Sequence, residues 1–262
     1  MTSQGVWLRC NTRTMTALFR LLARLPLPWL QTLGVGVGWL VWWASPCYRQ
    51  RFLQNTQAAG LRWDQVRPAV AAAGMMLAEL PWLWMRPAAQ RLYLPLQWDG
   101  LNHVTDALQQ GQGMILLSPH LGCWELGAQM MAEHLGPVHG PMWVMYRPAR
   151  KAWLRDLVAG GRERPFLQAA PANQSGVRQL LRTLRQGGYT AILPDQVPPQ
   201  GQGVWSRFFG QDAYTITLAV RLARQTGARV VMGWCERLPK GQGFISHFEP
   251  WDDVGLHDAQ VP

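Results

Sequence analysis

The sequence has 262 residues, of which 48% are hydrophobic and only 15% are charged, and its formal net charge is +10. A chain of this length suits one sizeable α/β domain with an appendage, or two small domains. All but two of the 25 basic residues, Lys151 and Lys240, are arginines. Arginine favours an anionic partner, although a genome rich in arginine codons would give the same bias. A nucleic acid is not expected, because no basic run is interleaved with aromatic residues on a recognisable binding module.

The first 63 residues form a candidate membrane-anchoring segment. No Asp or Glu precedes Asp64. The uncharged run from residue 25 to residue 48, LPLPWLQTLGVGVGWLVWWASPCY, is long enough to cross about 30 Å of hydrocarbon as a helix. Its prolines and its alternating glycines weaken a spanning helix, so a helix lying in the membrane interface, or an ordinary core helix, stays open. The first two arrangements place the protein at a membrane, anchored in a single pass or at the interface.

The remainder, residues 64–262, is predicted to be one α/β domain. Residues 64–97 form a helical lead-in, because Ala, Met and Leu recur at helical spacing in most of this segment. Further along, strands are expected at 114–118, 142–146, 165–169, 189–193, 229–236 and 243–249, and helices at 101–110, 122–135, 175–186 and 213–226. This alternation predicts a largely parallel central sheet that is flanked by helices on both faces.

The segment SPHLGCWELG, residues 118–127, places a histidine and a glutamate at the exit of a buried strand. Inside one helix, His120 and Glu125 would point about 140° apart, since each residue turns roughly 100°. They can cooperate if His120 lies in the strand-to-helix turn and Glu125 in the first turns of the helix. The carboxyl end of a parallel strand is where open α/β sheets bind ligands. There the carboxylate could fix the imidazole tautomer and leave the other nitrogen free to take a proton.

The cysteines are scattered and include no C-x-x-C pair: Cys10, Cys47, Cys123 and Cys235. This argues against a disulfide framework and fits a reducing compartment. Only His120 and Glu125 are clustered, so no metal site and no cofactor are predicted. Cys123, next to the histidine motif, leaves an acyl-cysteine intermediate open.

Three motifs in order carry a resemblance to a known family. PHLGCWELG resembles the H-x-x-x-x-[D/E] motif of the glycerolipid acyltransferase superfamily, in the form of the bacterial lipid A late acyltransferases, the lauroyl and myristoyl transferases. YRP, residues 146–148, follows the next strand as in that family. LPDQVPPQGQGVWSRFFGQDAYT, residues 193–215, is similar to its Pro-Asp-Gln, glycine, Phe-Phe-Gly and Ala-x-Thr run. The resemblance covers roughly residues 15 to 250.

The resemblance implies an enzyme on the cytoplasmic face of the bacterial inner membrane. It would move a fatty acyl chain from acyl carrier protein or coenzyme A to a hydroxyl of a lipid A precursor. His120 would deprotonate that hydroxyl, and Glu125 would orient the imidazole and balance its charge. The hydroxyl then attacks the thioester directly. Arg147 would stabilise the oxyanion or a substrate phosphate, or else form only a surface salt bridge.

The same motifs supply further candidate substrate-binding residues: Tyr146, Asp195, Gln196, Phe209 and Gly210. Asp195 and Gln196 close a strand, so they either face the same crevice or support the loop. Phe209 and Gly210, with Phe208, are expected to shape an acyl groove or the core.

Two other functions stay open. The acceptor could be a different lipid, such as a phospholipid or an aminolipid, because the motifs specify the reaction and not the acceptor. The sequence also ends with EPWDDVGLHDAQVP, where members of the family usually continue into a further helix and a basic tail. A truncated chain or a short member would explain this, and a catalytically inactive lipid-binding relative is the third hypothesis.

Overall fold

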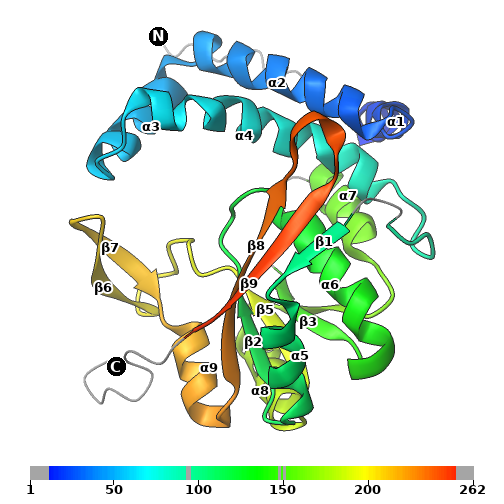
Figure 1. The fold of residues 1–262 in the computed structure, drawn as a ribbon, viewed down its shortest axis with the longest axis vertical. Helices are drawn as coiled ribbons and strands as arrows, with labels where there is room; N and C mark the ends of the chain where they lie inside the picture. Colours follow the sequence, from blue (N-terminus) through cyan, green and yellow to red (C-terminus); the bar gives the residue numbers. More distant parts are fainter. Residues whose placement is uncertain (1–11, 93–95, 147–148, 150–151, 252–262) are drawn as a thin grey trace.

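A seven-stranded sheet forms the centre of the molecule (Figure 1). The structure is a computed structural model that describes residues 12–92, 96–146, 149 and 152–251. In spatial order the strands are β1 (Leu96–Asp99), β9 (Phe244–Pro250), β8 (Arg229–Arg237), β2 (Met114–Leu117), β5 (Tyr189–Ile192), β3 (Met142–Tyr146) and β4 (Leu167–Pro171). The run from β8 to β4 is parallel, whereas β1 and β9 are parallel to each other and β9 is antiparallel to β8. The predicted α/β fold with a largely parallel sheet is confirmed.

Helices cover both faces of this sheet. The helices α5 (Leu101–Gln109) and α6 (Trp124–His139) pack on one face, and α8 (Gln174–Arg185) and α9 (Leu218–Thr226) on the other. β2 shows the alternation, because Met114 and Leu116 join the first core and Ile115 and Leu117 the second. Buried on both sides, β2 has no polar residue, as expected for a central parallel strand.

The N-terminal helices form a separate layer at the top of Figure 1. They are α1 (Thr12–Leu22), α2 (Leu27–Ala44), α3 (Pro46–Ala58) and α4 (Trp63–Trp84), and α4 also contacts α7 (Ala152–Arg162). None of the helices in the described ranges is both long enough and apolar enough to cross a membrane. The predicted division between residues 63 and 64 stays a prediction.

Glycines allow α2 to lie directly against α4. A Cβ atom on Gly74 would come within 2.0 Å of the Gly34 carbonyl oxygen, and one on Gly38 within 2.3 Å of the Val70 carbonyl oxygen. The two backbones therefore touch where they cross. A buried cluster continues this contact to the sheet, because Glu79 on α4 accepts hydrogen bonds from Gln31 on α2 and from Arg237 at the end of β8.

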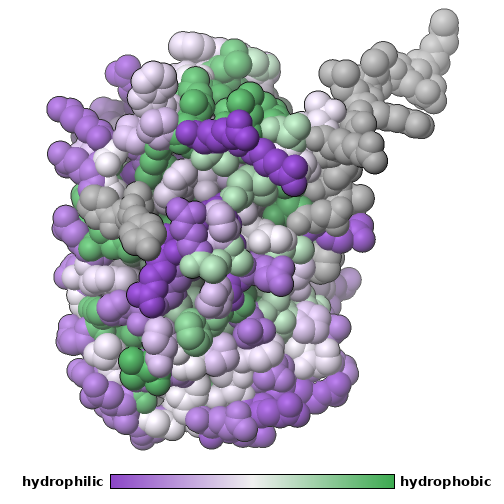
Figure 2. Space-filling view, turned by 90° about the vertical axis from the view of Figure 1, so that its right-hand side faces the viewer, coloured by the Kyte–Doolittle hydropathy of each residue, from purple (hydrophilic) through white to green (hydrophobic). Residues whose placement is uncertain are grey.

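One face of α2 remains exposed, and it is apolar. Its large exposed side chains recur at helical spacing: Trp29, Leu33, Val37, Leu40 and Trp43. Figure 2 shows apolar side chains gathered toward the top of one side of the molecule, the end at which Figure 1 places the N-terminal helices, and hydrophilic side chains along the lower rim.

The long loop predicted after β5 contains a β-hairpin. The strands β6 (Gly203–Phe208) and β7 (Gln211–Ile216) pair antiparallel, and α9 therefore begins at Leu218 and not at residue 213. Phe209 and Gly210 form the two-residue turn with φ of 48° and 74°, as a type I′ hairpin turn requires. The hairpin lies apart from the central sheet (Figure 1).

Substitution of alanine at two glycines of α2 tests the close contact. Gly38→Ala should lower the free energy of unfolding by about 1–3 kcal/mol, because the new methyl group overlaps the α4 backbone. Gly36→Ala, two residues away with no atom within 4 Å of the new methyl group, should be neutral or stabilising by up to about 1 kcal/mol, since alanine is the better helix former. Denaturant titration in mild detergent compares the two. Equal effects would contradict the contact.

Candidate active site

His120 lies in the turn between β2 and α6, and Asp195 holds it. The His120 ring Nδ1 lies 2.7 Å from Asp195 Oδ1, and the His120 backbone N–H donates to Asp195 Oδ2 at 2.7 Å. Asp195 follows β5, which pairs with β2 in the sheet. Two neighbouring parallel strands therefore deliver the two side chains to the same edge. Both side chains are partly exposed.

The predicted pairing of His120 with Glu125 is wrong. Glu125 lies in the first turn of α6 and is only 4% exposed. Its two oxygens accept hydrogen bonds from Arg162 Nε and Nη2, each at 2.7 Å, and Oε1 also accepts from the Trp84 indole at 3.0 Å. The first turn of α6 therefore directs Glu125 toward α4 and α7, while His120 is held by Asp195, which follows the neighbouring strand β5.

The tautomer of His120 follows from these contacts. A carboxylate can only accept, so Nδ1 carries the proton and Nε2 presents its lone pair. Nε2 lies 3.2 Å from Gln196 Nε2, an amide donor, and the Trp124 ring packs edge-on at 4.7 Å from the imidazole centroid. Partial burial raises the pKa of Asp195, but the hydrogen bonds from His120 outweigh this and hold the pKa below its usual value. Asp195 is therefore ionised at neutral pH.

Arg162 presents a fixed positive charge beside this pair. Its guanidinium carbon lies 5.6 Å from the Trp124 ring and 5.7 Å from the Tyr146 ring, within cation–π range. Burial lowers the pKa of Arg162, but the hydrogen bond with Glu125 outweighs it, so the pKa is raised. The sequence prediction missed Arg162. The sequence feature that could have identified Arg162 is the amphipathic helical pattern of residues 152–162, which ends in this arginine.

One cavity of about 1230 Å³ is lined by His120, Trp124, Glu125, Arg162 and Gln196. Its polar end contains His120, Glu125, Arg162 and Gln196. An apolar part of the cavity lies between α6 and the sheet. The small residues Gly127, Ala128, Ala191 and Gly233 leave space there, and the larger residues Leu116, Met131 and Phe248 border it. Another rim of the cavity is formed by the first turns of α8 and α9, which contribute Arg178 and Arg221. The site thus joins a base, a cation and an apolar channel.

The remaining residues that the sequence suggested for the site lie in several different places. Tyr146 contacts Arg162 from β3, and its buried hydroxyl has no hydrogen-bond partner among the residues that the structure describes. Phe209 and Gly210 lie at the tip of the hairpin and do not line the cavity. Arg147 lies outside the described residues. Cys123 is 4% exposed, its thiol donates to Glu79, and burial raises its pKa well above the usual value, which disfavours an acyl-cysteine intermediate.

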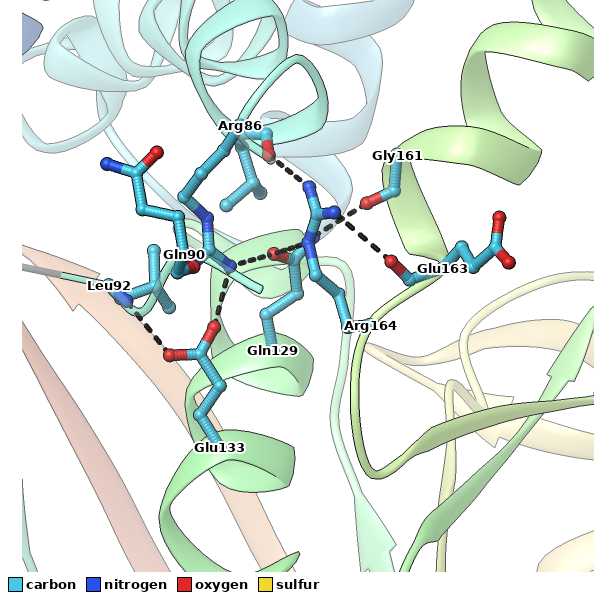
Figure 3. Close-up of polar contacts among 9 residues, drawn as sticks. Arg86, Gln90, Leu92, Gln129, Glu133, Gly161, Glu163 and Arg164 are labelled. Atoms are coloured by element: carbon cyan, nitrogen blue, oxygen red, sulfur yellow. Dashed lines mark hydrogen bonds and ion pairs between the residues drawn. The ribbon is translucent and has the colours of Figure 1, made fainter. Parts of the chain in front are cut away.

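A buried polar cluster supports the walls of this cavity (Figure 3). Arg86, just beyond α4, donates to Gln129 and Glu133 of α6, and Glu133 also accepts from the Leu92 backbone N–H. Arg164, two residues after Arg162, donates to Gln129 and to the Leu83 carbonyl. The cluster therefore fixes the ends of α4 and α7 against α6, and with them the arginine that meets Glu125.

Comparison with known proteins identifies the family of this chain. Residues 8–259 match the model of the bacterial lipid A biosynthesis acyltransferase family. The chain belongs to this family. It is 30% identical over 135 residues to a lipid A biosynthesis acyltransferase of Haemophilus influenzae, and 25% identical over 190 residues to a lipid A biosynthesis lauroyltransferase of Escherichia coli. These alignments cover 52% and 72% of this acyltransferase-family chain, and 41% and 59% of the two relatives.

Replacement of Glu133 tests the supporting cluster. Glu133→Gln should lower the free energy of unfolding by about 3 kcal/mol, because it leaves the buried guanidinium of Arg86 without its anionic partner. Glu163→Gln, at an exposed position next to Arg164, is the matched control and should change it by less than about 0.5 kcal/mol. Calorimetry of the purified protein measures both. A stable Glu133→Gln protein would show that the ion pair is not needed.

Proposed function

We propose that this protein transfers a fatty acyl chain from an acyl thioester to a hydroxyl group of a lipid A precursor. Membership of the family supports the reaction class. The observation that carries the proposal is the His120–Asp195 pair at the polar end of a cavity that continues into an apolar channel. A deprotonating imidazole and a lined channel are the two requirements for acylating an alcohol with a long-chain thioester.

His120 acts as the general base. Its Nε2 exchanges the contact with Gln196 for the acceptor hydroxyl and takes the hydroxyl proton. The oxygen attacks the thioester carbonyl, a C–O bond forms, the C–S bond breaks, and the imidazolium returns the proton to the departing thiolate. Asp195 keeps Nδ1 protonated and balances the imidazolium charge. No acyl-enzyme is needed.

Arg162 and Glu125 act together beside the histidine. Arg162 offers a permanent charge to the carbonyl oxygen that becomes negative in the transition state, or to a phosphate of the acceptor. Glu125 is a positioning residue for Arg162, because its two oxygens fix the plane of the guanidinium. This assignment gives the second residue of the H-x-x-x-x-[D/E] motif a role that does not require contact with His120.

The exposed apolar side of α2 supports contact with a lipid surface. Trp29, Leu33, Leu40 and Trp43 are exposed on the face of α2 that does not meet α4. Arg20 and Arg24 precede α2 and are exposed, as in helices that lie in the interface of anionic membranes. Free thiols at Cys47, Cys123 and Cys235 suit the reducing side of the inner membrane, its cytoplasmic face.

Substitutions in the pair test the reaction. Asp195→Asn and His120→Ala should lower kcat for transfer from lauroyl thioester to a lipid A precursor by about 10²–10⁴-fold, because the base is misoriented or absent. Transfer is measured with radiolabelled donor and thin-layer chromatography, and circular dichroism checks the fold.

Asp212→Asn is the control. It also removes one negative charge, but on the exposed hairpin and away from the cavity, so this variant should retain activity. If the enzyme tolerated Asp195→Asn but lost activity with Glu125→Gln, the glutamate and not Asp195 would support the base. Near-normal turnover of His120→Ala would reject the mechanism.

Charge on the exposed face of α2 tests the lipid contact. Leu33→Glu combined with Leu40→Glu should weaken binding to vesicles of anionic phospholipid by about tenfold or more, since each change removes apolar burial and adds repulsion. Val138→Glu, which introduces a charge at a 79% exposed position at the end of α6, is the control and should bind as the unmodified protein does. Sedimentation with vesicles measures the bound fraction. Unchanged binding of the double variant would exclude this face.

A further inference from the structure

The two ring nitrogens of His120 are contacted by successive residues of one loop. Asp195 Oδ1 lies 2.7 Å from Nδ1, and the side-chain nitrogen of Gln196 lies 3.2 Å from Nε2. Because Asp195 keeps the proton on Nδ1, the second contact is a hydrogen bond that the Gln196 amide donates to the imidazole. The lone pair with which His120 acts as a base is therefore occupied before any substrate binds.

The side chain of Gln196 can leave this position without disturbing Asp195. Gln196 is exposed in the loop that follows β5, and within the described part of the chain its amide is hydrogen-bonded only to His120. The backbone on either side is restricted by three prolines, Pro194, Pro198 and Pro199. Rotation of one side chain is thus enough to release Nε2.

The amide nitrogen of Gln196 occupies the place that a reacting oxygen needs. A hydroxyl that loses its proton to Nε2 has to come within about 2.6–3.2 Å of it, and the Gln196 nitrogen lies in that range. The His120 side chain is 29% exposed and lines the open cavity, so water can reach it. Water activated there would hydrolyse the acyl donor, a side reaction that transferases have to suppress.

We propose that Gln196 caps the base until the acceptor arrives and thereby limits hydrolysis of the acyl donor. The inference rests on the proposed function and concerns the site before the acceptor binds. A lone water that displaces the amide only exchanges one hydrogen bond for another. An acceptor that is already bound along the cavity presents its hydroxyl at a high effective concentration and displaces the amide. Gln196 is therefore a positioning residue that favours one nucleophile over the other.

The suppressed reaction uses the same groups as transfer. His120 Nε2 takes a proton from water, the water oxygen attacks the thioester carbonyl, a C–O bond forms and the C–S bond breaks. The imidazolium returns the proton to the departing thiolate, and the products are a free fatty acid and a thiol. Loss of the cap makes the base available to water for more of the time. Transfer changes little, because the acceptor has already displaced the amide when it reacts.

Gln196→Met tests the cap, because methionine keeps the length of the side chain but has no N–H to donate. With lauroyl-coenzyme A and no acceptor, hydrolysis should rise by about two- to tenfold, as expected for the loss of one neutral hydrogen bond. For transfer to a lipid A precursor, kcat should stay within about twofold and KM for the acceptor should not rise. Radiolabelled donor and thin-layer chromatography separate free laurate from acylated lipid, and circular dichroism checks the fold.

Gln200→Met is the matched control. It makes the same change in the same loop, at an exposed position that does not line the cavity, and should leave both rates unchanged. Unchanged hydrolysis by Gln196→Met would overturn the cap. So would an equal rise in Gln200→Met, or a parallel loss of hydrolysis and transfer in a folded Gln196→Met protein, because Gln196 would then support the imidazole.

The proposed function can fail separately. If the unmodified protein and Gln196→Met both leave the lipid A precursor unacylated, the proposed acceptor is wrong. Faster hydrolysis by Gln196→Met that disappears when His120→Ala is added would still establish the cap, because that readout needs no acceptor.

Discussion

The hydrogen bonds between Asp195 and His120 are the constraint on which the site depends. They join residues that are 75 positions apart in the chain, and they form because β2 and β5 are parallel neighbours that end at the same edge. The backbone contact fixes the turn, and the ring contact fixes the tautomer. A histidine in a free loop would lose rotamer freedom only when substrate arrived, whereas this one is already oriented. The parallel sheet is thus the means by which a partly exposed imidazole is held in one orientation.

The second carboxylate of the site has a different environment and a different partner. Asp195 is partly exposed and meets a histidine, while Glu125 is buried and meets an arginine. Burial of a lone carboxylate costs several kcal/mol, and the two-pronged contact with Arg162 offsets that cost. This arrangement ties α6 to α7 and holds a cation in the same cavity as His120. The two acids near the cavity therefore have different roles: Asp195 orients the imidazole of His120, and Glu125 orients the guanidinium of Arg162.

The sequence predicted six of the seven strands of the sheet, the four helices that flank it and the position of His120. These depend on local patterns, such as the buried run MILL before the turn. The edge strand β1 was missed, because the predicted helical lead-in to residue 97 overlaps it, whereas α4 ends at Trp84. The partner of His120 could not be predicted. Helical spacing shows only how Glu125 lies on its own helix, whereas the contact with Asp195 depends on β5 being next to β2 in the sheet, and the sequence does not give the order of the strands. Asp195 was recognised as a candidate only because it closes a strand. The hairpin was missed because its strands are largely exposed, so no burial pattern marked them, and its turn is made by Phe209 and Gly210 without the usual Asn-Gly pair.

The same glycines that weaken α2 as a spanning helix explain its place in the fold. Gly34 and Gly38 pack on the α4 backbone, while the large apolar residues of α2 lie on the other side. A helix with one side closed by another helix can present only its remaining face to lipid. Glu79 then links this pair of helices, through Arg237, to β8, the strand that borders β2. The apolar face of α2 is therefore linked, through two helices and one strand, to the edge of the sheet at which His120 and Asp195 meet.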